Sequence, residues 1–199
     1  MKNQFPFLIL LVCTITLVSC KEGAEKNTES VEEKVEQFEE KDKDLGTWLQ
    51  DLAGTTPNTG EELIAKLPKE LIGMSLRSTG NPSSQTIAGT YSLDEDPNNK
   101  STSISITVVD GAGTNGFQHV NAVYKLINQK VDFKSEEGWS KTYEYKGNQL
   151  LIKEQVNKDI QRSELEYIKD NRYHITLSGL RLKSDTLLEA MDDLEKTKF

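Results

Sequence analysis

Apolar and polar positions alternate in two consecutive runs, residues 86–93 and 101–109, the second of which reads "STSISITVV". Alternation with a period of two is typical of a β-strand that buries one face. The alternating positions are Ile87, Gly89, Tyr91, Leu93, Ile104, Ile106 and Val108. We therefore predict two strands, joined across the turn-forming stretch "DEDPNNK" at 94–100.

The spacing of apolar residues is helical in three other places. "TGEELIAKL", residues 59–67, has Thr59 three positions before Glu62, which is a capping box, and Pro68 ends it. The second helix is predicted from a single apolar stripe made by Phe117, Val120, Tyr124 and Ile127. The third begins near Thr186 and is predicted to bury Leu187, Leu188, Met191 and Leu194.

Between these last two helices the chain has short strand patterns separated by tight turns. The strand patterns are "VDF" at 131–133, "WSKTYEY" at 139–145, "QLLIKEQV" at 149–156, "QRSELEYI" at 161–168 and "RYHITL" at 172–177. Connections this short join antiparallel neighbours, because parallel strands need a long crossover. The predicted fold class is α+β, with a single, mostly antiparallel sheet flanked by helices.

The order of these elements resembles bacterial lipoproteins of the Mog1/PsbP-like fold class. The resemblance rests on "LPKELIGMSLRS", a strand pair ending in "ITVVDGAG", the amphipathic helix, the strand meander and the terminal "LLEAMDDL". It covers most of residues 60–197. It implies a sandwich of helices around an antiparallel sheet, a fold used mainly for binding and assembly.

The first 19 residues are typical of an export signal. Lys2 precedes an apolar run from Phe5 to Val18, which is shorter than the roughly 20 residues of a membrane-spanning helix. The run ends in "LVSC", which resembles the lipobox of bacterial lipoproteins and implies that Cys20 becomes the lipidated N-terminus. An ordinary secretory signal is the alternative. Lys at position 21, where inner-membrane retention uses Asp, favours the outer membrane.

Residues 20–57 are predicted to be a charged, largely disordered tether, because Glu, Lys, Asn, Ser and Asp dominate the segment. A single domain is expected over 58–199. "LGTWLQDL" within the tether, with Trp48 and Leu52, is interpreted either as a helix that docks on this domain or as the sticky end of a linker.

Charge and cysteine content exclude several classes of partner and of chemistry. The formal net charge of −8 argues against nucleic acid as a partner, since nucleic acid binds basic surfaces. Cys13 and Cys20 are the two cysteines, so loss of the signal leaves one sulfur, which the lipid occupies. Disulfides, thiol catalysis and cysteine metal sites are therefore not expected in the mature protein.

Gly111, Gly113 and Gly116 have the spacing of a dinucleotide-binding loop between a strand and a helix. The parallel sheet and the acidic residue that this fingerprint requires are missing, so no cofactor is expected. We interpret the three glycines as supplying positive φ angles where the chain turns into the helix. Binding of an anion or another ligand at that helix N-terminus is the alternative.

The acidic loop starts like a calcium-binding loop, with Asp94, Asp96 and Asn98. Asn99 stands at the position that needs glycine and Ser105 at the position that needs glutamate, so an EF-hand is excluded. The loop is interpreted as a polar turn, with a looser surface cation site as the alternative. No other metal site is expected.

His119 and His174 are the only histidines, and their spacing gives no reason for them to meet. We therefore expect two separate histidines at the surface or at the edge of the core. Trp139, Tyr143 and Tyr145 share one face of a predicted strand. That face is expected to lie under a helix, although an exposed aromatic strip would stack on sugars or receive a partner.

No Ser lies in a nucleophile elbow, and no catalytic set is evident. The sequence thus favours a membrane-anchored envelope lipoprotein, held by the lipid on Cys20, whose domain is a non-enzymatic binding or assembly factor for a protein or small ligand. The two alternatives are a hydrolase of envelope material that uses His119, His174 or the acidic loop, and a carbohydrate-binding lipoprotein.

Overall fold

The computed structural model of the chain describes residues 44–93, 102–157 and 160–199. These residues belong to a compact unit, Lys43–Phe199, which includes part of the segment that composition assigned to the tether. The signal, Cys20 and the acidic loop Asp94–Asn99 lie outside the described residues, so their predicted roles stay predictions.

Nine strands form one sheet in which every neighbouring pair is antiparallel. The strands are β1 (Glu70–Leu71), β2 (Met74–Ser83), β3 (Thr86–Ser92), β4 (Ser103–Asp110), β5 (Asp132–Lys134), β6 (Gly138–Tyr145), β7 (Asn148–Asn157), β8 (Ile160–Lys169) and β9 (Tyr173–Leu180). The spatial order is β1-β2-β3-β4-β9-β8-β7-β6-β5. The predicted α+β class with one antiparallel sheet is confirmed.

Four helical segments accompany the sheet: residues 44–54, α2 (Gly60–Lys66), α3 (Gly113–Ile127) and α4 (Ser184–Leu194). The predicted capping box is present, because the Thr59 hydroxyl accepts from the backbone of Glu62 and the Glu62 carboxylate accepts from the backbone of Thr59. α3 carries the chain from β4 to the outer strand β5, and the meander then returns until β9 pairs with β4.

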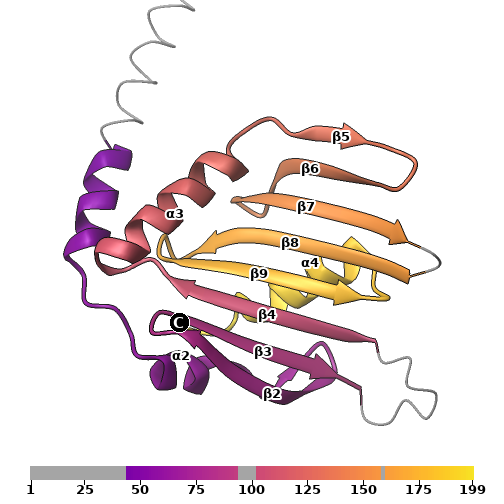
Figure 1. Ribbon diagram of the computed structural model, residues 1–199, viewed down its shortest axis with the longest axis horizontal. Coiled ribbons are helices and arrows are strands. Elements are labelled where there is room, and N and C mark those ends of the chain that lie inside the picture. The colour runs from indigo at the N-terminus through magenta and orange to yellow at the C-terminus, as the bar shows by residue number, and fades with distance from the viewer. Residues whose placement is uncertain (1–43, 94–101, 158–159) are drawn as a thin grey trace, which may run out of the picture. The chain divides into compact units, whose positions relative to one another are not determined.

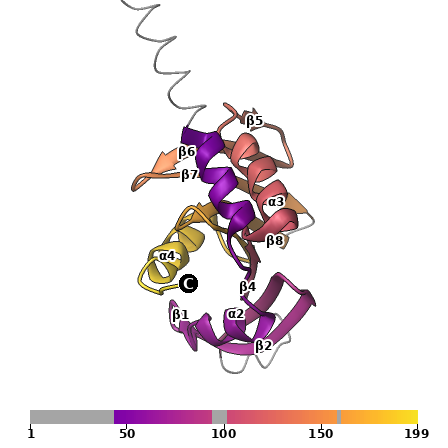
Figure 2. The same cartoon turned by 90° about the vertical axis from the view of Figure 1, so that its left-hand side faces the viewer.

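The main core lies on the side of the sheet that faces α4 (Figures 1 and 2). Alternate residues of the central strands point into it and are fully buried, as are residues of α4. They include Ile87, Tyr91, Ile104, Ile106, Val108, Ile152, Leu165, Tyr167, Ile175, Leu177, Leu187, Ala190 and Leu194. The period-two pattern of the sequence thus marks the buried positions of the sheet, with the exception of Leu93, which lies beyond the end of β3 and is 58% exposed.

The opposite side of the sheet is covered over only part of its area. α3 crosses it at one end, where Val123 and Ile127 pack against Leu151 of β7 in a small second core (Figure 1). Beyond α3, this side carries serine, threonine and charged side chains. We call it the open face. An antiparallel sheet can leave one side in water when that side is polar.

The segment 44–54 is a helix that docks on the rest of the unit, which agrees with one of the two interpretations of its sequence. Trp48 meets the ring of Tyr124 on α3 edge-on, with 5.4 Å between ring centroids. Its Nε1 donates to the carbonyl oxygen of Asn171 in the turn between β8 and β9, at 2.6 Å. Leu52 is buried.

Candidate functional site

The glycine loop lies at the junction of β4 and α3. Glycine is required at its three positions for two different physical reasons. Only Gly113 has a positive φ, +74°, so the prediction of positive φ angles is wrong for the other two. A Cβ on Gly111 would lie 2.4 Å from the carbonyl oxygen of Arg172, and one on Gly116 would lie 2.5 Å from that of Asp110. Close backbone packing requires glycine at these two positions.

The carboxylate of Asp110 lies beside the N-terminus of α3. Asp110 is fully buried and accepts hydrogen bonds from the backbone N–H groups of Asn58 (2.8 Å) and Ala112 (3.0 Å). Arg172 binds the same carboxylate through Nε and Nη2, each at 2.7 Å. Burial alone would raise the pKa of Asp110, but these hydrogen bonds outweigh it and lower the pKa below its usual value. The loop is thus filled by an internal ion pair.

His119 and His174 meet on the open face, which the sequence analysis did not anticipate. Nε2 of His119, on α3, lies 2.9 Å from Nδ1 of His174, on β9. The ring centroids are 5.1 Å apart. His174 is only 7% exposed, whereas His119 is exposed on its helix. The interpretation of the two histidines as separate residues is wrong, because α3 crosses directly over β9.

The pair continues into a charged network on β7 and β8. Oε2 of Glu166 lies 3.5 Å from Nε2 of His174, and Oε1 lies 2.7 Å from Nζ of Lys153. Lys153 also binds Oε1 of Glu164 at 2.7 Å. Contact with His174 lowers the pKa of Glu166 most, burial opposes it and Lys153 adds to it, so that the pKa falls to about 2. Glu166 is therefore a carboxylate at neutral pH.

The two imidazoles share one proton position: of Nε2 of His119 and Nδ1 of His174, one nitrogen donates and the other accepts. Nε2 of His174 faces the Glu166 carboxylate at 3.5 Å and the Thr176 hydroxyl at 3.3 Å. Burial and the neighbouring His174 lower the pKa of His119, so its imidazole is neutral near pH 7. Chemically, this end of the network can accept a proton.

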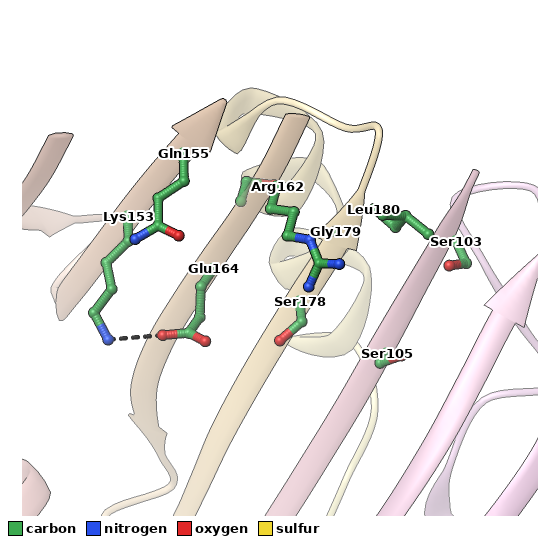
Figure 3. Close-up of a pocket in the computed structure, with 10 residues that line it drawn as sticks. Ser103, Ser105, Lys153, Gln155, Arg162, Glu164, Ser178, Gly179 and Leu180 are labelled. Carbon is green, nitrogen blue, oxygen red and sulfur yellow. Dashed lines mark hydrogen bonds and ion pairs between the residues drawn. The ribbon is translucent and has the colours of Figure 1, made fainter. Parts of the chain in front are cut away.

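Next to the network, the open face is hollowed over about 400 Å³ (Figure 3). The hollow crosses four neighbouring strands, β7, β8, β9 and β4, and most of the residues that line it are polar. The lining residues on the open face are Ser103, Ser105, Lys153, Gln155, Arg162, Glu164, Ser178 and Leu180. A volume of this size is within the range of pockets for small molecules.

A second hollow, of about 730 Å³, lies toward the sheet edge at β5 and β6. Lys153 and Gln155 line both hollows, so the two adjoin at β7. Phe133 and Trp139 line the second hollow, and Phe133 is 60% exposed. We call the two adjoining hollows the groove, which has a polar end near β4 and an aromatic end near β5.

The structure places the predicted aromatic strip on the other side of the sheet. Tyr143 and Tyr145 are half-buried against the main core, and the hydroxyl of Tyr145 donates to Asp192 of α4 at 3.1 Å. These two tyrosines therefore contact the helix that covers this side. Trp139 is also half-buried against the core but lines the second hollow.

The groove residues were not singled out from the sequence. A usable signal was present: short runs of alternate positions in β4, β7, β8 and β9 are polar, such as Ser103 and Ser105, Lys153 and Gln155, Arg162 and Glu164, and Thr176 and Ser178. Among the described residues, no group of three or more His, Cys, Asp or Glu could hold a metal ion. No described helix is long and apolar enough to span a membrane.

Comparison of the chain with protein families, with curated proteins and with solved structures finds no match. The features that bear on function are therefore the open face and the sequence itself.

Proposed function

We propose that this protein is an envelope lipoprotein, anchored by lipid on Cys20 in the outer membrane, whose domain is a non-enzymatic binding module of the Mog1/PsbP-like fold class. The lipobox-like "LVSC" supports the anchor. The α+β architecture and the order of its elements support the fold class.

The observation that carries the binding role is the pair of adjoining hollows on the open face. They lie on the part of the sheet that α3 leaves uncovered, and their lining changes from hydroxyl and charged groups near Ser105 to the aromatic ring of Phe133. Such a mixture orients a ligand through a few polar contacts and holds it through an apolar surface. A sheet side that served solubility alone would need neither a hollow nor an exposed aromatic residue.

Binding can be followed by intrinsic fluorescence of the full-length protein in detergent. The chain has two tryptophans, Trp48 and Trp139, and Trp139 contributes to the lining of the second hollow while its side chain packs against the main core. Trp48→Phe therefore leaves one reporter beside the groove. We expect the emission of this variant to shift on titration with at least one member of a panel of neutral and acidic hexasaccharides and hexapeptides. If no member shifts it and none binds in calorimetry, the binding role is wrong.

The anchor is tested separately by mass spectrometry of the native protein. The proposal expects acyl chains on a new N-terminal Cys20 and loss of membrane association in Cys20→Ala. An unmodified cysteine, or a leader that is still attached, would contradict the lipoprotein assignment and leave the binding role unaffected.

The second candidate is a hydrolase, and the observation that favours it is the His119–His174–Glu166 chain. A carboxylate that orients one imidazole, which in turn orients a second, leaves a neutral base at the surface. We expect His119→Ala and His174→Ala together to remove any hydrolytic activity found on envelope polysaccharide or peptide substrates. Unchanged activity in the double variant would eliminate this candidate.

A further inference from the structure

The polar end of the groove holds one arginine whose charge is not compensated, and this observation extends the proposed binding role. Arg162 projects from β8 on the open face, and its side chain reaches toward Ser178 on the neighbouring strand β9 (Figure 3). Within the described part of the chain, Arg162 forms no ion pair or hydrogen bond through its side chain. Its guanidinium is exposed to the hollow.

The carboxylates near Arg162 are already engaged by another cation. Lys153 binds Glu164 and Glu166, each at 2.7 Å, and Figure 3 shows Glu164 directed toward Lys153 and away from the guanidinium. Among the described residues that line the hollow, Lys153 and Glu164 are thus paired, and Arg162 is the charged residue left without a partner. A guanidinium presents N–H donors in a planar fork that matches the two oxygens of a carboxylate.

Three serine hydroxyls lie on the strands beside Arg162. Ser105 on β4 is paired in register with Ser178 on β9, and Ser103 lies two residues before Ser105 on the same side. None of these three hydroxyls forms a hydrogen bond within residues 44–93, 102–157 and 160–199. Each can both donate and accept, which is what the hydroxyl groups of a sugar require.

We propose that the groove binds a saccharide that carries a carboxylate, with Arg162 binding the acidic group and the serines of β4 and β9 binding sugar hydroxyls. The neighbouring aromatic end, at Phe133, would receive the next sugar ring. A peptide is less well matched, because the hollow offers a cluster of hydroxyls and no unpaired strand edge.

The test compares two trisaccharides of the same length, trigalacturonic acid and neutral galactotriose, on the full-length Trp48→Phe protein. A charge-assisted bidentate pair predicts that the acid binds about 10- to 100-fold more tightly than the neutral sugar. Arg162→Gln should abolish this difference, while Lys125→Gln, an equal change of charge on exposed α3, should preserve it. Replacement of Ser103, Ser105 and Ser178 by alanine should weaken both sugars.

The outcomes separate this inference from the proposed function. If Arg162→Gln keeps the preference for the acid, or if triglutamate binds as tightly as the acidic sugar, the saccharide assignment is overturned and the binding role stands. If both trisaccharides fail to bind but another member of the wider panel does, the assignment is again overturned. Circular dichroism of Arg162→Gln confirms that the variant is folded.

Discussion

Nε2 of His119 lies 2.9 Å from Nδ1 of His174, although 55 positions separate the two residues in the sequence. The distance between ring centroids, 5.1 Å, is close to the greatest that this nitrogen contact allows, so the two nitrogens point at each other along one line. This is the geometry of a shared proton, in which one imidazole donates and the other accepts. The contact links α3 to β9, the central strand of the sheet.

Loss of the inner histidine should cost more stability than loss of the outer one. His174→Ala leaves the mostly buried carboxylate of Glu166 with one partner fewer, so we expect the free energy of unfolding to fall by about 1–3 kcal/mol. His119→Ala removes an exposed side chain and should cost less than about 1 kcal/mol. Urea denaturation of both variants checks the order, and a larger loss in His119→Ala would contradict the assigned network.

The buried pair of Asp110 and Arg172 should dominate the local stability of the β4–α3 junction. Asp110→Asn leaves the guanidinium of Arg172 without its carboxylate, and breaking such a pair costs about 3–5 kcal/mol. Thermal unfolding of the variant measures this cost. Asp132→Asn is the matched control, because its ion pair with Lys141 is exposed and 3.9 Å long. Equal losses in the two variants would contradict the prediction.

The carboxylate of Asp110 also makes the stability of the folded protein depend on pH. The folded-state pKa of Asp110 lies below its ordinary value of 3.8, so the unfolded chain takes up this proton first as the pH falls. The stabilisation is complete above the ordinary pKa and is lost as the pH falls through the folded-state value. The free energy of unfolding, measured between pH 5 and pH 2, should therefore fall less steeply with decreasing pH in Asp110→Asn than in the parent protein.

Gly111→Ala should be strongly destabilising despite the small size of the added methyl group. Its Cβ would lie 2.4 Å from a backbone oxygen, which cannot rotate away, and 2.6 Å from Val120. We expect a loss of more than about 2 kcal/mol, in the range of overpacked cores. Gly54→Ala is the control, because nothing lies within 4 Å of the added atom. If the melting temperatures of the two variants agree, the close approach at Gly111 is wrong.

Trp48 should hold the helix 44–54 against α3 and the β8–β9 turn without contributing to the main core. Trp48→Ala removes one aromatic contact and one hydrogen bond, worth together about 1–2 kcal/mol. Hydrogen exchange should become faster within residues 44–54 and stay unchanged in β4, β8 and β9. Uniformly faster exchange across the sheet would show that this helix is part of the cooperative fold.

The sequence predicted the strands whose apolar residues alternate, such as those around Ile104 and Ile106, because one side of each is buried. It did not predict β2, in which every residue from Ser78 to Ser83 is exposed and no alternation survives. It did predict the short strand β5 from the pattern "VDF" at 131–133, although that strand is exposed throughout. β2 is held by backbone hydrogen bonds to its neighbours, which leave no mark on the side-chain pattern.

The candidate site was harder to predict because it is assembled from strands that are distant in the sequence. Ser105 and Ser178 come together only when β9, the last strand, pairs with β4. His119 meets His174 because α3 crosses that same strand pair. Local spacing carries no information about such pairings. Arg162 was visible as a charged residue in a strand, but its lack of a partner is a property of the folded neighbourhood.

Trp48 also marks the end of the sheet on which the helix 44–54 docks. Its contacts are at the α3 end of the sheet, with Tyr124 and Asn171, whereas Arg162 and Ser103 lie at the opposite ends of their strands. The helix 44–54 and the polar hollow therefore occupy opposite ends of the sheet. A ligand bound in the hollow would leave the docking of this helix undisturbed.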